Sequence, residues 1–289
     1  IWHLKAIQFF IPARIYCSVE YRRRLKRRLN IRNPRYFNEK IQWLKLYDHN
    51  PIYSRLVDKY EVRQYVKDIM GEKYLIPLIG VYNRIEEIPF DKLPEKYVLK
   101  CTHDSGTVII QNETCCLTEK EIKQKLKKAL QRNYYYEHRE WPYKYVKPRI
   151  ICEKYMVDES GYELKDYKIH CFNGKPKLIQ VDFGRFTNNH RRNLYDTEWN
   201  FINASILYPN DPFIAIKKPD KLNEMLKVAS ILANSFPYVR VDLYVVNDRI
   251  YFGELTFHHG AGYEKFIPEE LELQMGDWID LEACYKEGF

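Results

Sequence analysis

The most constraining feature of this sequence is a pair of carboxylates embedded in apolar strands near the C-terminal end. Residues 240–256 read as two paired strands, in which Asp242 and Glu254 stand among apolar neighbours. Burying an unpaired carboxylate costs several kcal/mol or forces a pKa shift, so the pair requires a metal, a paired base or a basic ligand complex. Because isolated lysines stand on other predicted strands, we interpret the two acids as ligands that hold Mg²⁺ against the phosphates of a nucleotide. A salt bridge with Arg240 or Arg249 is the structural alternative.

The composition predicts a soluble, globular chain. Its 289 residues are 45% hydrophobic, which is enough to bury a core in one large lobe or in roughly two or three small ones. No apolar run approaches the roughly 20 residues that cross a bilayer. The 7 cysteines are an odd number without zinc-ligand spacing, which argues against a disulfide scaffold and a structural zinc site. A reducing, cytoplasmic location is therefore expected.

The net charge of +8 is unevenly placed along the chain. The run Arg22–Arg28 supplies much of it, which favours an acidic partner such as a nucleotide, an anionic polymer or a membrane face. The arginine-rich helix expected there reads either as a solvated surface or as a site of peripheral attachment to the inner face of the cell membrane. Nucleic acid is not expected as a partner, because the sequence shows no nucleic-acid-binding module around this run.

Strand pairs alternate with helices, without a regular βαβ rhythm. This order predicts an α+β architecture with antiparallel sheets in separate lobes, and a nucleotide in the cleft between the lobes. We expect three segments: a helical N-terminal region over 1–95, a lid over 96–157 and a metal-binding part over 158–289. The expected helices are 38–67, interrupted at Asn50-Pro51, then 118–132 and 221–235; the expected strands are 74–82, 97–101, 107–111, 149–156, 167–171, 177–182, 240–246 and 249–256.

Lys100 is the first candidate for a phosphate ligand. It stands in the middle of a predicted strand, where a charged side chain is costly unless an anion meets it. The loop that follows holds His103, Ser105 and Gly106, and its backbone N–H groups can fold over a phosphate because glycine allows a close approach. The alternative is an ordinary hairpin with an edge lysine that points to water.

Other charged groups stand near strand ends or on a predicted helix. The end of the strand 149–156 makes a candidate site for the nucleotide base, with Asp158 or Glu159 near the ribose; a solvated turn is the alternative. Lys168 offers a further cation for phosphate, or else forms a surface pair with Asp166. Lys59 follows Asp58 on a predicted helix, whose charged face is otherwise solvated. The base-site residues are Glu153, Lys154, Tyr155 and Met156.

The loop 258–262 follows the second carboxylate. His258, its histidine neighbour and Gly260 bring imidazoles and flexible backbone next to the expected metal, although histidine pairs also occur as ordinary hydrogen-bonded groups.

In this order, the candidate residues resemble the nucleotide site of the ATP-grasp superfamily. The phrases that carry this resemblance are Asp58-Lys59, Lys100 with its glycine-containing loop, Glu153 to Met156, Asp166 to Lys168, Arg240 to Asp242 and Glu254 to Thr256. Further phrases resemble its TupA-like (teichuronopeptide-biosynthesis) branch: Phe37 to Trp43, Val57 to Tyr60, His103 to Gly106, Asp166 to Gly174 and Gly253 to Phe257. The resemblance covers about Tyr36 to Leu281.

The resemblance implies a fold of two α+β lobes that grip ATP, and a ligase that works through an acyl phosphate. It assigns phosphate binding to Lys59, Lys100 and Lys168, the adenine to the base-site residues, and magnesium to Asp242 and Glu254. It places Arg240 near the transferred phosphate or the acyl phosphate. The catalytic assignments are therefore Arg240 and Lys168, and the cofactors are ATP and Mg²⁺.

Two positions depart from the pattern of the resembling proteins. Thr256 stands where superfamily members commonly have asparagine, which leaves the third metal ligand open, with water as the alternative. Asp104 stands where the branch usually has glycine, and it brings a negative side chain into the expected phosphate loop.

By analogy with the branch, the substrate is a uronic-acid carboxyl of a bacterial surface polysaccharide or its precursor, joined to an amino acid or another amine. Phosphorylation turns the carboxylate into an acyl phosphate that an amine attacks. Arg185, His190, Arg191, His258 and Gly260 are the substrate candidates. Two alternatives stay open: a glycosyltransferase of polysaccharide biosynthesis, and a non-catalytic polysaccharide-assembly protein.

Overall fold

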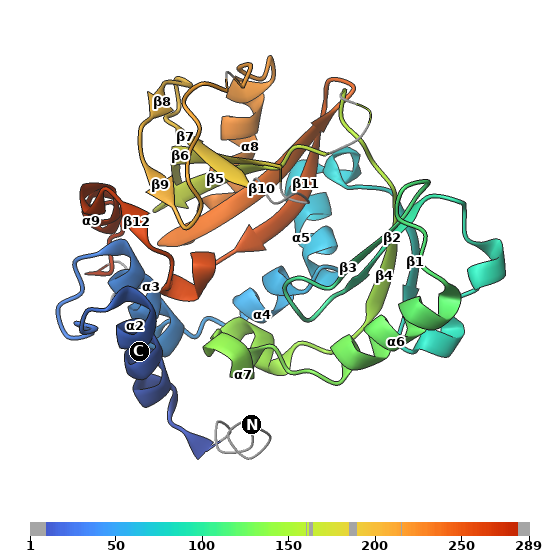
Figure 1. Ribbon diagram of the computed structural model, residues 1–289, viewed down its shortest axis with the longest axis horizontal. Coiled ribbons are helices and arrows are strands. Elements are labelled where there is room, and N and C mark those ends of the chain that lie inside the picture. Colours follow the sequence, from blue (N-terminus) through green and yellow to red (C-terminus); the bar gives the residue numbers. More distant parts are fainter. Residues whose placement is uncertain (1–9, 160, 162–163, 185–189, 215, 283–289) are drawn as a thin grey trace. The chain divides into compact units, whose positions relative to one another are not determined.

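The computed structural model describes residues 10–159, 161, 164–184, 190–214 and 216–282 (Figure 1). Two compact units make up the chain. We name them by their place along the sequence: the central unit is residues 50–163, and the outer unit combines residues 1–49 with 164–289. This division differs from the three expected segments. Strand pairing joins residues 78–82 to residues 150–153 within the central unit, whereas the helices before residue 50 pack with the C-terminal part of the chain.

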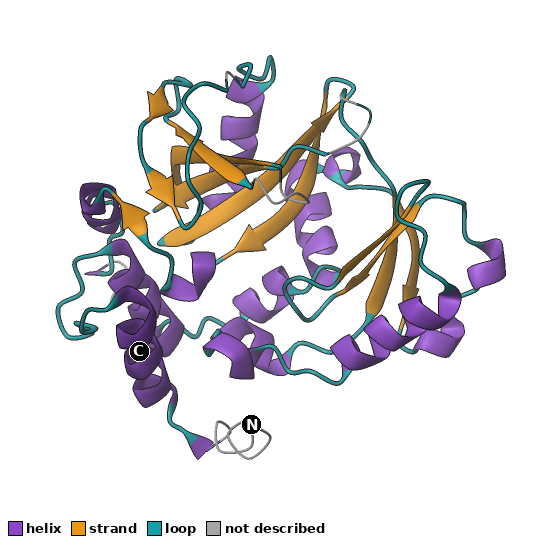
Figure 2. Ribbon diagram, in the orientation of Figure 1, coloured by secondary structure: helices purple, strands orange, loops and turns teal. Residues whose placement is uncertain are grey.

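The central unit is built around an antiparallel sheet of four strands in the order β1-β4-β2-β3. Along the chain, two α-helices precede the first of these strands and two stand between the third and the fourth (Figure 2). The elements are α4 (Ile52–Val57), α5 (Glu61–Met70), β1 (Leu78–Tyr82), β2 (Tyr97–Cys101), β3 (Val108–Gln111), α6 (Glu119–Leu130), α7 (Tyr135–His138) and β4 (Ile150–Lys154).

The two faces of this sheet differ in chemistry. Leu99 of β2 and Cys152 of β4 are opposite each other, and they belong to one buried core with Ile122 and Leu126 of α6. Because successive side chains of a strand point to opposite faces, Lys100 and its neighbours turn to the other face. The local alternation of the sequence therefore separates a helix-covered apolar face from a charged one.

The outer unit contains an antiparallel sheet of six strands in the order β11-β10-β5-β6-β7-β8 and a small sheet of β12 and β9. The elements are α2 (Ala13–Leu25), α3 (Phe37–Tyr47), β5 (Tyr167–Phe172), β6 (Lys175–Phe183), β7 (Arg191–Tyr195), β8 (Phe201–Ile202), β9 (Ser205–Ile206), α8 (Leu222–Ala233), β10 (Tyr238–Val246), β11 (Arg249–Thr256), β12 (Phe266–Ile267) and α9 (Glu269–Asp277).

One face of the six-stranded sheet is covered by α8, which packs against β10, β5 and β6. The register of the strand pairs determines which side chains lie together on the opposite face. Lys168 of β5 is paired with Asp242 of β10 on one side and with Gln180 of β6 on the other. Arg240 is paired with Thr256 of β11. We call this side of the sheet the charged face.

The α+β class and the main strand pairs follow the expectation from sequence. The expected strand at 74–82 begins only at Leu78, because residues 72–74 form a 3₁₀ turn and Pro77 lacks the N–H that a strand interior uses. The strands β7, β8, β9 and β12 and the helix α9 were not expected. Among the described helices, none has the length and apolar character needed to cross a bilayer.

Candidate functional site

In the central unit, Lys100 finds its anion in Glu153. Lys100 Nζ lies 2.7 Å from Glu153 Oε2, and Arg63 Nη1 of α5 lies 2.9 Å from Glu153 Oε1. Glu153 is buried, and these two bases supply the opposite charge that a buried carboxylate requires. The alternative of a lysine that points to water is wrong for Lys100. Sequence reasoning missed Arg63, which is 90 residues away from its partner and carries no local signal.

The loop between β2 and β3 is held by two buried side chains. His103 Nε2 lies 3.2 Å from the carbonyl oxygen of Ala129, and burial lowers the pKa of His103. Asp104 is fully buried and accepts a hydrogen bond from Thr107. Asp104 therefore does not bring its charge to the loop surface. Ser105 and Gly106 are exposed, and Gly106 has a φ of +108°, which glycine adopts without strain.

Lys59 lies in the turn between α4 and α5 rather than on a helix. Asp58 ends α4 in an extended conformation, and its Oδ1 accepts from the N–H of Tyr60 at 2.8 Å at the start of α5. The helix therefore cannot continue through this point. Lys59 Nζ donates to the carbonyl of Asp104, and its backbone N–H donates to Thr102 at 3.2 Å. The structure thus brings Lys59 to the loop that follows Lys100.

The other residues assigned to the nucleotide lie around the end of β4. The backbone N–H of Lys154 donates to Pro77 at 2.9 Å, and Tyr155 accepts a hydrogen bond from Asn112 at 3.0 Å. Met156 is half-buried, Asp158 is buried, and Glu159 is exposed. The expected strand to residue 156 ends at Lys154.

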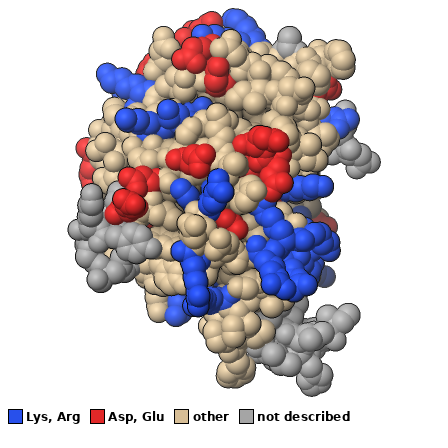
Figure 3. Space-filling view, turned by 90° about the vertical axis from the view of Figure 1, so that its left-hand side faces the viewer, with Lys and Arg blue, Asp and Glu red and all other residues tan. Residues whose placement is uncertain are grey.

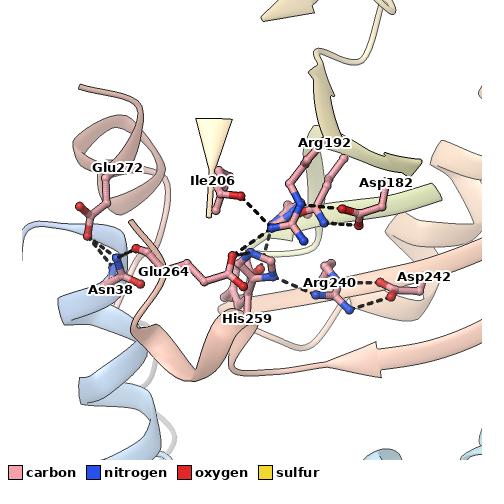
Figure 4. A network of polar contacts seen from close by, with 12 residues as sticks. Asn38, Asp182, Arg192, Ile206, Arg240, Asp242, His259, Glu264 and Glu272 are labelled. Carbon is pink, nitrogen blue, oxygen red and sulfur yellow. Dashed lines mark hydrogen bonds and ion pairs between the residues drawn. The ribbon is translucent and has the colours of Figure 1, made fainter. Parts of the chain in front are cut away.

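In the outer unit, Asp242 lies on the charged face next to Arg240 (Figure 4). Arg240 grips it with two hydrogen bonds, Nε to Oδ1 at 2.6 Å and Nη2 to Oδ2 at 2.7 Å. Lys168 Nζ lies 2.8 Å from Asp242 Oδ2 and also pairs with Asp166. Lys168 is buried, so the alternative of a surface pair is wrong. Burial opposes ionisation of Asp242, but Arg240 and Lys168 outweigh it and lower its pKa.

Glu254 lies opposite Asp242 on the neighbouring strand, and a bulge follows the pair. Arg240 Nη2 also lies 3.0 Å from Glu254 Oε1, so one nitrogen bridges the two carboxylates. Thr256 donates its hydroxyl to the same Oε1 at 3.0 Å. The Asp242 side chain is 1% exposed and that of Glu254 is 41% exposed. The expected strand pair is confirmed, with Arg240 as the base between its acids.

The charged face continues through four further side chains, one of which, His259, the sequence had already placed next to the expected metal. His259 Nδ1 lies 2.8 Å from Arg240 Nη1, and His259 Nε2 lies 2.9 Å from Glu264 Oε2. Arg192 Nη1 lies 3.1 Å from Glu264, and Arg192 Nε donates to Asp182 at 2.8 Å. Asp182 and Arg192 sit opposite each other on β6 and β7. Alternation within β6 was the only signal for Asp182.

The loop 258–262 is a tight turn fastened to α3. Its residues Gly260, Ala261 and Gly262 have φ of +55°, +53° and +72°. Gln42 donates to the carbonyls of Ala261 and Gly262 at 3.0 and 2.8 Å, and buried Lys45 donates to Ala261 at 2.8 Å. These α3 residues share one face. Their hydrogen bonds fix the turn that holds His259 next to Arg240, so the backbone expected to be flexible is held in place. We call residues 258–262 the braced turn.

The candidate substrate residues contact different partners and do not form one cluster among the described residues. His190 stacks on Tyr208 with ring centroids 3.7 Å apart and lies 3.0 Å from Asp182. Arg191 begins β7, and His258 is buried. Gly260 lies in the braced turn. Arg185 is outside the described residues.

The buried histidines of the charged face predict acid sensitivity. Burial, with the nearby charge of Arg240, lowers the pKa of His170 and of His259 below 6.5, against the opposing effect of Glu264 on His259. Their other neighbours are Tyr238, Gln180 and Arg192. The unfolded chain therefore binds protons first, and we expect the free energy of unfolding to fall as pH drops below about 6.5, by up to about 1.4 kcal/mol per pH unit for each histidine.

The measurement is the thermal midpoint between about pH 7.5 and 5. His259→Asn should flatten this dependence, because it removes one of the two groups. A midpoint that is constant or rises on acidification would contradict neutral, buried histidines.

The chain matches a known protein family over most of its length. The family described as TupA-like ATP-grasp matches residues 39–280. Among curated proteins, none matches the chain in sequence. Solved structures that resemble this chain at low identity include a ligase and two synthetases. D-alanine–D-alanine ligase from Bacillus anthracis shares 19% identity over 81% of this chain and 70% of that chain, with a TM-score of 0.44.

The D-cycloserine synthetase DcsG shares 12% identity over 80% of this chain and 72% of its own, with a TM-score of 0.42. N5-carboxyaminoimidazole ribonucleotide synthetase shares 14% over 76% of this chain and 50% of its own, with a TM-score of 0.42. The assignment rests on the family match, which spans most of the chain. The chain therefore belongs to the TupA-like ATP-grasp family, and with it to the ATP-grasp enzymes.

Proposed function

We propose that this protein is an ATP-dependent carboxylate–amine ligase that amidates a uronic-acid carboxyl of a bacterial surface polysaccharide, of the capsular or teichuronopeptide type, or of its precursor. The amine is an amino acid or another small amine. Membership of the TupA-like ATP-grasp family supports the use of ATP and the formation of a carbon–nitrogen bond.

The observation that carries the proposal is the charge balance of the charged face. Among the described residues, four carboxylates, from Asp182, Asp242, Glu254 and Glu264, contact three permanently charged bases, from Lys168, Arg192 and Arg240. These carboxylates exceed these bases by one. The two buried histidines do not offset this excess at neutral pH, because their pKa values are lowered.

A divalent cation fits this excess of negative charge. Asp242 and Glu254 present hard oxygen donors from adjacent strands, and a nitrogen of Arg240 already bridges them. Among the described residues, no group of three or more His, Cys, Asp or Glu side chains forms a metal site. Mg²⁺ suits such a pair, because it keeps several waters and takes its remaining ligands from substrate phosphates. When bound, Mg²⁺ would supply neutralising charge to the phosphate oxygens.

The chain's own bases have separate tasks in the proposed reaction. Lys168 and Arg240 are buried and fixed by Asp242, so their charge is preorganised and costs little reorganisation when phosphate charge develops. In the central unit, Lys59 and Lys100 would bind phosphate oxygens, and Ser105 and Gly106 would offer the exposed backbone of their loop. Transfer of the γ-phosphoryl group to the carboxylate gives an acyl phosphate and ADP. Attack by the amine then forms the amide and releases phosphate.

The experiment measures ADP and amide formation with Mg·ATP, a panel of uronic acids and a panel of amino acids. We expect ADP release that requires both an acid and an amine, and a raised thermal midpoint with Mg·ATP, because a ligand that binds only the folded state stabilises it. Consumption of a nucleotide sugar without ADP would replace the proposal with a glycosyltransferase. If the protein showed no turnover and no nucleotide-dependent thermal shift, the result would replace the proposal with a non-catalytic assembly protein.

A further inference from the structure

Helix α2 leaves large apolar side chains in solvent on one side. Phe10, which precedes the helix, is 88% exposed, and Ile15 and Val19 are 55% and 59% exposed. Ile15 and Val19 are four residues apart, so they are neighbours on the same face of the helix. The opposite side of α2, with Cys17 and Tyr21, is buried. The helix is therefore apolar on its inner face and on part of its outer face.

Basic residues complete the outer surface of α2 and the turn after it. Residues 13–28 contain seven Lys or Arg and one Glu, so the excess of six bases accounts for six of the eight net positive charges of the chain. Arg22 continues the row of Ile15 and Val19 by helical spacing, and Lys26 ends the helix next to it. Both are exposed. Figure 3 shows Lys and Arg gathered on the side of the molecule where α2 lies.

The inner side of α2 is firmly attached to the outer unit. Tyr21 packs with Ala261 and Tyr263 in one buried cluster. Arg27, just after the helix, pairs with Glu269 at 2.6 Å and also with Glu272 of α9. The outer surface is therefore presented by a fixed helix rather than by a free tail.

We propose that the surface formed by Ile15, Val19, Arg22 and Lys26, together with the exposed Phe10 before the helix, docks on an anionic lipid bilayer. An in-plane helix at the boundary between headgroups and acyl chains buries apolar side chains there, while its Lys and Arg meet the negative headgroups. An acidic polymer or nucleic acid would meet the bases but leave the three apolar side chains in water. A lipid surface would contact both the apolar side chains and the bases. It would hold the protein at a membrane independently of its catalytic chemistry.

The test is cosedimentation of the full chain with vesicles of phosphatidylcholine alone, or of phosphatidylcholine mixed with phosphatidylglycerol. We expect binding to the anionic vesicles only, weakened by salt. Ile15→Ser with Val19→Ser should weaken it at least about tenfold, because each removes buried apolar area. Arg22→Gln with Lys26→Gln should also weaken it. Lys127→Gln with Lys128→Gln on α6 removes the same charge elsewhere and should have little effect.

All of these side chains are exposed, so each variant should keep the thermal midpoint of the wild type. Absence of binding to anionic vesicles would overturn the proposal, and so would equal binding to neutral ones. An equal loss in the α6 control would show attraction by net charge alone and would also overturn it. Ligase activity on soluble substrates is measured separately, so failure of either proposal is recognised without the other.

Discussion

Replacing Glu254 by glutamine is expected to lower Mg·ATP-dependent turnover by about a hundredfold or more, because the proposed Mg²⁺ site loses a charged oxygen donor and would hold the neutralising ion less tightly. The substitution keeps the size of the side chain and an Oε1 that still accepts from Arg240 and Thr256. Since the Glu254 side chain is 41% exposed, its ion pair contributes little to stability. We therefore expect a free energy of unfolding within about 1 kcal/mol of the wild type.

Asp242→Asn is the matched comparison, and it should behave differently. Asp242 is buried and accepts from Arg240 through both oxygens and from Lys168. Asparagine would turn an N–H₂ group towards these cations and remove the buried anion that they share, which costs about 3 kcal/mol or more. Turnover and stability should fall together in this variant.

Steady-state ADP release and chemical denaturation of both variants separate catalysis from folding. Wild-type turnover in Glu254→Gln and Asp242→Asn alike would reduce the two acids to structural partners of Arg240. Unchanged stability of Asp242→Asn would show that the buried ion pairs are not needed by the fold.

Replacing Gly262 by alanine is expected to destabilise the outer unit and slow the reaction. Gly262 has a φ of +72°, and an added Cβ would lie 2.6 Å from Gln42 Nε2 and 3.0 Å from Ile41 Cγ2. Gln42 cannot yield freely, because it is buried and binds the carbonyls of Ala261 and Gly262. Backbone strain and overpacking together should cost about 2–4 kcal/mol.

The effect on turnover follows from what the turn carries. Moving the carbonyls away from Gln42 and Lys45 would shift His259, which lies against Arg240. A displaced Arg240 should lower kcat by about tenfold or more, because small misplacements of a positioning group are costly. The KM for ATP should change less, since Lys59 and Lys100, the proposed phosphate ligands of the central unit, are untouched.

Gly71→Ala is the control for backbone strain alone. Gly71 has a φ of +92°, but an added Cβ would meet nothing within 4 Å. It should cost about 1 kcal/mol and leave kcat unchanged. If Gly262→Ala matches this control in stability and in kcat, the braced turn has no part in positioning Arg240.

Local rules of the chain predicted most of the fold and part of the site. Alternation placed Leu99 and Lys100 on opposite faces of their strand, and the short connection between 240–246 and 249–256 brought Asp242 and Glu254 together. The requirement that buried acids meet a cation was also readable from sequence. The helix expected at Lys59 failed because Asp58 caps the next helix instead, a contact that helical periodicity does not reveal.

The sequence by itself determined the α+β class, the main strands and which charged residues need partners, because alternation and turn chemistry act over a few residues. Only the tertiary structure determined which side chains pair with these charged residues. Arg63 meets Glu153 across 90 residues and Arg192 meets Glu264 across 72, and α3 braces a turn more than two hundred residues later. Such contacts depend on how sheets and helices pack, and the local pattern around any one residue does not contain that information.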